Sequence, residues 1–437
     1  MVNLYYLYAI YFKHKTVLFT VPPLSGRMEI IMPKKLLLLL PCIIASFIFI
    51  SCGKEYNTAN TYIPYQDDQY TYKNHAGTPI AESEEGYYFL AGYYLFYADK
   101  STMKPIILCN KPNCLHYEET DPEKITSCNA CFPSMSSSSS VSFFDGNVYV
   151  LKNNEGTVHE LIRLSKDGTK RKTVLHFKYA PTSLAIHRRK VYVTSTVFDK
   201  DGNSIYGVSE YDLSKAATQK PVTIYEGKIT GGNIQDIIGY GQNLYFREFA
   251  MNSEITAVRI QHYDLDTNKV TCIVQEEEDT FPSHMAFMDD TLLYNCTTID
   301  SITGEITQIF NYMCELDGTN LKESFPIDNY QMLYSDGKYI YLDDAKFSPF
   351  SKPIEEVSLI VADSQGNEIA SIPTGDYHKF SDIICGSDKH LFMINKIDSV
   401  KQILYANKDE FEAGTFDFKV MYEIDDDKMT PGYVTYN

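Results

Sequence analysis

The chain of 437 residues is acidic: 57 Asp and Glu residues against 39 Lys and Arg give a formal net charge of −18. This charge argues against nucleic acid and anionic lipid head groups as partners, because both are themselves negative. Apolar residues make up 44% of the chain and charged residues 22%, which is the composition of a globular protein with a large core.

An export signal is predicted over residues 32–51. A basic start at 32–35 precedes an apolar stretch at 36–50, which is short for a membrane span. Ser51 and Cys52 end that stretch, and a small residue before a Cys at this place resembles the bacterial lipoprotein signal. The resemblance implies that Cys52 carries lipid and that the protein lies on the extracytoplasmic side of the bacterial cell membrane. An uncleaved membrane anchor is the alternative.

Two segments flank this signal. Residues 1–31 hold a second apolar stretch, and we interpret them as a mis-assigned upstream start, with translation beginning at Met28 or Met32. Residues 52–77 are polar and rich in Tyr, without a clear period. They are predicted to be a flexible tether between the membrane and the folded domain.

A hairpin phrase recurs through residues 78–437. At 144–150 a turn of Asp, Gly and Asn leads into alternating aromatic and β-branched residues, which is typical of a tight hairpin and a half-buried strand. Equivalent positions fall at Tyr88, Tyr149, Tyr192, Tyr245, Leu293, Ile340 and Phe392. The steps between these positions are close to the length of one β-propeller blade.

Each repeat divides into four short strands. In the third, these are expected at 183–186, 190–197, 206–213 and 222–225, with turns rich in Asp, Gly, Asn and Lys. The sequence therefore predicts an all-β fold, a seven-bladed β-propeller of four-stranded antiparallel blades over 78–437, after the lipoprotein signal. The competing interpretation is a pair of β-sandwiches, which do not repeat a hairpin at blade spacing.

An insertion at 109–140 holds the sharpest local motif. Cys109, Cys114, His116 and Cys128 lie within twenty residues, and three thiolates with one imidazole satisfy a tetrahedral structural zinc ion. Disulfides are an alternative, since an exported location favours them, and reduced thiols are a third. These alternatives remain open at the level of sequence.

The same segment carries a family resemblance. Residues 109–116 read Cys-Asn-Lys-Pro-Asn-Cys-Leu-His, and 128–130 read Cys-Asn-Ala. This pattern resembles uncharacterised bacterial β-propeller lipoproteins that carry a Cys-Asn-Lys-Pro-x-Cys-x-His segment. The resemblance implies a propeller fold and a place in the cell envelope, and it brings no known activity. Cys131 is an additional thiol that the resembled family usually lacks.

A ligand face is predicted from loop lengths. In a propeller, the loops after the second and fourth strands share one face, and here they are the long, irregular ones, where binding groups concentrate. They contain the acids Asp199, Asp201, Glu276, Glu277, Glu278, Asp279, Asp343 and Asp344. A cationic partner or a divalent metal is therefore expected there in preference to an anion.

No catalytic motif is legible in the sequence. Nucleophile elbows, zinc-protease helices, phosphate-binding loops and dinucleotide fingerprints are all missing. We predict a non-enzymatic binding or protein-interaction module that is held to the membrane by lipid and binds an envelope protein, a peptide or a glycan. The alternative is a carbohydrate- or peptide-active propeller enzyme whose carboxylates converge from different blades at the channel mouth.

Overall fold

The computed structural model describes residues 58–74, 77–116, 119, 121–132, 140–153, 159–229, 231–251, 256–275, 280–300, 306–323, 331–343, 358–373, 383–397, 400–413 and 417–425. The chain divides into two units, Met1–Glu55 and Tyr56–Asn437, and every described residue belongs to the second. The predicted signal and Cys52 therefore lie outside the described residues. Among the described helices, none has the length and apolar character that a membrane crossing requires.

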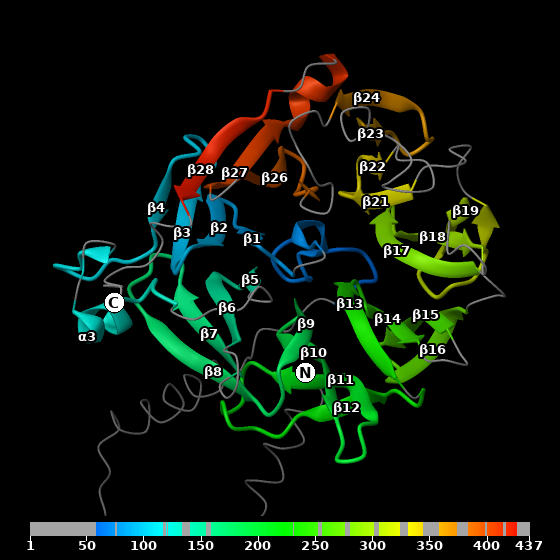
Figure 1. Cartoon of the computed structure of the whole chain (residues 1–437), viewed down its shortest axis with the longest axis horizontal. Coiled ribbons are helices and arrows are strands. Elements are labelled where there is room, and N and C mark those ends of the chain that lie inside the picture. The colour runs from blue at the N-terminus through cyan, green and yellow to red at the C-terminus, as the bar shows by residue number, and fades with distance from the viewer. Residues whose placement is uncertain are drawn as a thin grey trace, which may run out of the picture. The chain divides into compact units, whose positions relative to one another are not determined.

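The described strands form seven four-stranded antiparallel sheets, each built from strands consecutive in the chain (Figure 1). Blades 1 to 3 are β1 (Ile80–Glu82), β2 (Gly86–Ala91), β3 (Tyr94–Asp99) and β4 (Pro105–Ile107); β5 (Ser140–Phe144), β6 (Asn147–Asn153), β7 (His159–Ser165) and β8 (Arg171–Phe177); β9 (Pro181–His187), β10 (Lys190–Phe198), β11 (Ser204–Asp212) and β12 (Val222–Glu226).

Blades 4 to 7 continue in the same order around the ring. They are β13 (Gly232–Tyr240), β14 (Asn243–Met251), β15 (Thr256–Asp264) and β16 (Lys269–Val274); β17 (Thr280–Met288), β18 (Thr291–Ile299), β19 (Ile306–Glu315) and β20 (Lys322–Glu323); β21 (Gln331–Ser335), β22 (Ile340–Asp343), β23 (Ser358–Ala362) and β24 (Glu368–Pro373); β25 (Ile383–Ile384), β26 (His390–Ile397), β27 (Val400–Asn407) and β28 (Lys419–Asp425). Short helices are η1 (Tyr70–Tyr72), α3 (Pro122–Ser127) and η5 (Lys408–Ala413). The predicted seven-bladed, all-β propeller is confirmed.

The recurring hairpin phrase is the turn between the first and second strands of a blade. Between β5 and β6, Asp145 and Gly146 both have positive φ, at 45° and 73°, as a two-residue hairpin of the type that matches strand twist requires. Asp289 and Asp290 do the same between β17 and β18, at 48° and 57°. Short side chains that tolerate positive φ therefore form these two turns, whereas Arg188 and Arg189 take the same positive φ, at 46° and 76°, between β9 and β10.

Apolar faces of neighbouring sheets bury each other around the ring. Between blades 2 and 3, for example, Leu151 packs with Leu184 and Val193 in one buried cluster. Each such side chain contributes about 1.5–3 kcal/mol on burial. The ring closes in the same way, since Phe96 of blade 1 packs against Tyr422 of blade 7 at a ring-centroid distance of 4.5 Å, with the two rings tilted by 46°. Every described sheet keeps its own four consecutive strands, so side-chain packing joins the last blade to the first.

Residues 58–74 and 77–78, called the central segment here, lie in the middle of the ring (Figure 1). Its helix η1 is entirely buried, with Tyr70 against Phe287 of blade 5 at 5.3 Å between ring centroids. Gly386 of blade 7 donates its backbone N–H to the Thr71 carbonyl at 3.0 Å. A flexible tether is predicted over 52–77. Within the described part of that range, 58–74 and 77, the side chains of Tyr70 and Tyr72 are buried against the blades.

A buried ion pair fastens the central segment to the ring. Arg188, in the first turn of blade 3, donates from Nε to Asp67 Oδ1 at 2.7 Å and from Nη2 to Oδ2 at 3.3 Å. The backbone N–H groups of Ile63 and of Gly241, in blade 4, donate to Oδ2 at 3.1 and 3.0 Å. The Asp67 side chain has no exposed surface and the Arg188 side chain is only 6% exposed, so removing either charge would leave the other buried without its ion-pair partner.

Replacing Asp67 by Ala is expected to lower the free energy of unfolding by about 3–5 kcal/mol, because the Arg188 guanidinium would be left buried without its partner. The matched control is Glu85→Ala, which breaks the exposed pair Glu85–Lys166 and is expected to cost less than about 1 kcal/mol. Urea denaturation at pH 7 measures both. Equal stability of the two variants would show that the pair does not hold the segment.

Candidate functional site

A cavity of about 610 Å³, called the channel cavity here, lies in the middle of the ring. Its floor includes Tyr70, Lys73 and Asn74 of the central segment. That segment is bound to the turns between first and second strands, at Arg188 and Gly241, so it covers this end of the channel. The walls continue along the beginnings of first strands and the ends of second strands, toward the face where the loops after second and fourth strands emerge.

An arginine with fixed partners forms one wall of the cavity. Arg247 on β14 donates from Nη2 to Asp236 Oδ2 at 2.7 Å and to Gln235 Oε1 at 3.0 Å, and from Nη1 to the Ser283 carbonyl of blade 5. Asp236 lies in a bulge of β13 and has a φ of 54°, a strained conformation for a residue with a Cβ. The bulge places its carboxylate beside the guanidinium, so the two charges neutralise each other across the wall.

Uncharged polar groups line the rest of the wall. Thr182 Oγ1 lies 2.7 Å from Thr194 Oγ1 and faces the cavity. Thr196 Oγ1 and Asn233 Oδ1 are buried and have no hydrogen-bond partner within the described part of the chain. Between them lie apolar side chains: Leu151, Leu184, Ile234, Ile238 and Met285. The wall thus combines uncharged polar side chains with apolar patches.

The floor of the cavity is held by paired buried charges. Lys73 Nζ lies 2.6 Å from Asp68 Oδ2 and donates to the Ile237 carbonyl at 2.5 Å, and the Gly239 N–H donates to the same carboxylate at 3.2 Å. Burial raises the pKa of Asp68, and the Lys73 ammonium opposes that rise. Because Lys73 is neutralised here, the floor adds no free charge to the cavity.

His187 contacts the backbone of Asp68 and is fully buried. Its Nδ1 accepts the Asp68 N–H at 3.2 Å and its Nε2 lies 2.8 Å from the Gly241 carbonyl, so the neutral ring protonated on Nε2 satisfies both contacts. Burial lowers the pKa of His187 to about 4, although the carboxylate of Asp67 partly opposes the effect. The imidazole is therefore a neutral structural link between the central segment and blades 3 and 4.

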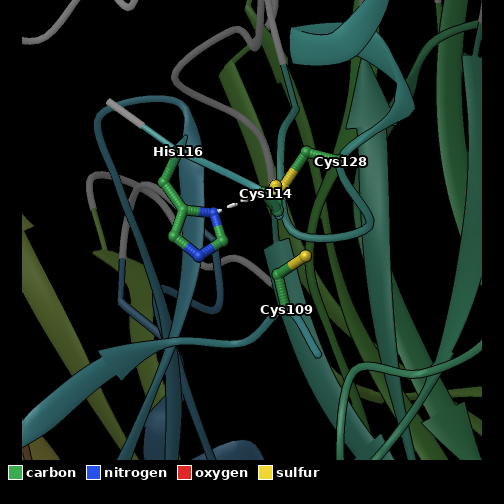
Figure 2. Close-up of side chains that lie close together, drawn as sticks. All are labelled: Cys109, Cys114, His116 and Cys128. Atoms are coloured by element: carbon green, nitrogen blue, oxygen red, sulfur yellow. Dashed lines mark hydrogen bonds between the residues drawn. The ribbon is translucent and has the colours of Figure 1, made fainter. Parts of the chain in front are cut away.

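Four sulfur and nitrogen ligands meet in the insertion between blades 1 and 2 (Figure 2). One ligand atom from each of Cys109, Cys114, His116 and Cys128 lies within 4.8 Å of all the others. His116 Nδ1 is 3.3 Å from Cys114 Sγ and 3.9 Å from Cys128 Sγ. These cysteines and Cys131 are free thiols in the structure. The sequence-predicted ligand set is thus brought together in space, without Cys131.

Local sequence explains how the chain reaches this arrangement. Asp121 caps α3 by accepting the Glu123 N–H at 3.0 Å, and Pro122 follows as the first helical residue. The Cys128 N–H closes the helix on the Lys124 carbonyl at 3.2 Å, which sets the direction of its side chain. Burial would raise the pKa of Cys109, but the backbone N–H groups that point at its sulfur bring that pKa below the ordinary value.

The predicted acidic ligand face is described only in part. Asp199 and Asp201 lie in the exposed turn between β10 and β11, where Asp199 Oδ1 accepts the N–H groups of Asp201 and Asn203, each at 2.8 Å. Asp343 ends β22, and residues 276–279 and 344 lie outside the described residues. None of the described residues that line the channel cavity is one of the eight predicted acids.

The charged residues of the cavity escaped the sequence analysis. Asp236 and Arg247 are brought together by a bulge in β13, and Lys73 belongs to a segment predicted to be a tether. No spacing in the sequence marks these positions, because neither a bulge nor the docking of a distant segment has a local pattern here. The Cys/His motif was found because its ligands are close in the chain.

No family model matches this chain, and no curated protein is detectably similar to it. Solved structures of similar fold include puromycin hydrolase, at 7% identity and a TM-score of 0.51 over 84% of this chain and 56% of that one. An oligogalacturonate lyase from Vibrio parahaemolyticus is 9% identical with a TM-score of 0.51, and the match covers 78% of this chain and 90% of that one. A chain of a nidogen/laminin complex is 14% identical with a TM-score of 0.36, and the match covers 65% of this chain and 92% of that one.

Identities as low as those to puromycin hydrolase and the Vibrio parahaemolyticus lyase show the fold alone. The chain spans little more than half of the puromycin hydrolase chain. The chain is therefore a β-propeller protein, and its function has to be argued from its own residues.

The buried neutral His187 makes stability depend on pH. Its pKa is about 4 in the folded state and about 6.5 when unfolded, so the unfolded chain takes up the proton first as pH falls. The stabilisation is complete above about pH 6.5 and is lost toward pH 4. As the pH falls from 7 to 5, the protonation of this residue in the unfolded state is expected to lower the free energy of unfolding by about 2 kcal/mol.

Urea denaturation of the wild type and of His187→Gln at pH 7 and pH 5 measures this loss, and the variant should lack that part of the fall. The exposed His176, replaced by Gln, is the control. Other buried histidines with lowered pKa values, His262 and His390, act in the same direction and are common to all three proteins. An identical fall in wild type and His187→Gln would contradict the assignment.

Proposed function

We propose that this protein is a lipid-anchored binding module on the extracytoplasmic side of a bacterial membrane, and that the channel cavity holds its ligand. The observation that carries the proposal is a cavity of about 610 Å³ that the central segment covers at one end, with a wall of uncharged polar and apolar side chains in which Thr196 Oγ1 and Asn233 Oδ1 find no hydrogen-bond partner among the described residues. Pockets of this size are typical of sites for small ligands or for the end of a chain.

The wall favours a ligand without net charge. The described charges at the cavity are already paired, Arg247 with Asp236 and Lys73 with Asp68. What remains for a ligand are uncharged polar side chains of the lining, such as Thr182, Thr196 and Asn233, and the adjacent apolar surface. Sugar rings and peptide backbones combine hydrogen-bonding groups with apolar faces in this way. We therefore assign a neutral glycan unit or a peptide segment to the cavity.

The lining supports binding over catalysis. Glycoside hydrolysis requires two carboxyl groups about 5–9.5 Å apart. Among the described residues of the lining, Asp236 is the one carboxylate, and it is engaged by Arg247. The Cys385 thiol also lines the cavity, but burial raises its pKa far above the ordinary value, which opposes formation of a thiolate nucleophile. An enzyme of this fold would therefore need groups that the described lining does not supply.

Filling the cavity is expected to weaken binding. Thr182→Trp adds an indole at an exposed lining position of β9, whereas Thr223→Trp adds the same group on the outer strand β12 of the same blade. Probes are neutral oligosaccharides and blocked tripeptides, titrated by calorimetry. We expect a probe that binds wild type saturably, binds Thr182→Trp at least tenfold more weakly and binds Thr223→Trp unchanged. Turnover of the bound probe, or equal binding by both variants, would contradict the proposal.

Lipid on Cys52 is the second part of the proposal. In cells given an alkyne-labelled palmitate, the wild-type protein is expected to carry the label and to sediment with membranes. Cys52→Ser should lack the label and leave the membrane fraction at mature size, or accumulate as precursor. Cys42→Ser, within the apolar stretch of the same signal, is the matched control and should be labelled normally. Mature-size Cys52→Ser that stays on membranes would exclude a lipid anchor.

A further inference from the structure

The outer edge of blade 1 is built from two separate pieces of chain. The first is β4, which pairs with β3 from Pro105 opposite Ala98 to Ile107 opposite Phe96. The second is residues 130–132, where the Leu95 N–H donates to the Ala130 carbonyl at 2.9 Å and the Phe132 N–H to that of Tyr93 at 2.7 Å. The described residues between these two pieces, 109–116, 119 and 121–129, form no part of the sheet.

The Cys/His cluster lies at this break. Cys109 follows the first piece by two residues, and Cys128 precedes the second by the same number. Cys114 and His116 come from the looped-out chain between them. In Figure 2 the His116 ring turns its Nδ1 toward the sulfur of Cys114, and the Cys109 and Cys128 side chains approach the same place from other sides.

The spacing of the ligand atoms fits one tetrahedral ion. With Zn–S bonds of about 2.3 Å and Zn–N of about 2.0–2.1 Å, a tetrahedron has S···N edges of about 3.6 Å. The observed distances from His116 Nδ1 are 3.3 Å to Cys114 Sγ and 3.9 Å to Cys128 Sγ, one on each side of that value. All four ligand atoms lie within 4.8 Å of one another.

We propose that Cys109, Cys114, His116 and Cys128 bind one zinc ion, His116 through Nδ1, and that the ion joins the two halves of the outer strand. Three thiolates and an imidazole fill all four positions of a tetrahedral zinc, so the site is structural and has no position for a substrate. Thiolate ligands also select zinc over magnesium or calcium, which prefer oxygen.

The neighbours of the cluster tie it to blade 2. Arg171, the first residue of β8, donates from Nη1 to the carbonyls of Cys128, Asn129 and Cys131 at 3.0, 3.1 and 2.7 Å. The Asn129 side chain donates to the Gly168 carbonyl of the β7–β8 turn at 2.8 Å. Groups in this second layer hold metal ligands in place. The ion would therefore brace the junction between blades 1 and 2 as well as the split strand.

The experiment uses the full-length chain, purified in mild detergent without chelator. We expect one zinc per chain by elemental analysis. After exchange into cobalt, we expect the intense visible bands of tetrahedral Co²⁺ with a thiolate charge-transfer band. Cys114→Ser and His116→Ala should reduce bound zinc at least tenfold. Cys131→Ser, a buried cysteine of the same insertion outside the cluster, is the matched control and should keep it.

Thiol counting separates zinc from a disulfide. Chelation should make three additional thiols reactive in the wild type, and peptide mass spectrometry should identify them as Cys109, Cys114 and Cys128. A disulfide among these three in freshly purified protein would overturn the proposal. So would reduced wild type that takes up no cobalt, or a Cys131→Ser variant that loses zinc as Cys114→Ser does. The wild-type measurements stand even where a ligand variant fails to fold.

Discussion

The closure of the ring depends on contacts that have a direction. Every described sheet keeps its own four strands, and blades 1 and 7 meet through apolar packing such as Phe96 against Tyr422 and through a buried contact of 2.7 Å between Tyr87 Oη and His390 Nδ1. Apolar contact is non-directional and does not by itself fix how blades are placed around an axis. The central segment supplies direction: Asp67 binds the first turns of blades 3 and 4, and Thr71 accepts the Gly386 N–H of blade 7. One short stretch thus ties distant blades to a common centre.

The same constraint shapes the cavity. Asp68 and His187 are buried and Lys73 is half-buried where the central segment meets the ring, and their charges are either paired or absent. Unpaired charge at that depth would cost several kcal/mol. The described residues at the floor of the cavity therefore add no unpaired charge. The Arg247–Asp236 pair neutralises the charge of the wall in the same way. The acidic net charge of the chain is not carried into the described lining of its central cavity.

What the sequence predicts well is what is local in the chain. The blade hairpins are legible because positive φ at positions such as Asp145 and Gly146 restricts residue type, and the repeat then gives seven units. The Cys/His set is legible because its ligands lie within twenty residues. The docking of the central segment cannot be predicted in this way, because Asp67 and its partner Arg188 are 121 residues apart in the chain and no local pattern links the two positions. Asp236 reaches the cavity wall through a bulge in β13, and no residue pattern in that strand predicts the bulge.

The channel cavity and the Cys/His cluster occupy different parts of a blade. The cavity is lined by first and second strands, which face the axis, whereas the Cys/His cluster interrupts the fourth strand of blade 1, at the outer edge. A metal at that edge acts on the cavity only through the packing of blades 1 and 2. The cavity wall opposite, from β9 to β17, rests on blades 3 to 5, whose contacts with the central segment do not pass through the insertion. Metal binding is therefore expected to change the stability of the ring more than the affinity for a ligand, since most of the lining residues lie outside blades 1 and 2.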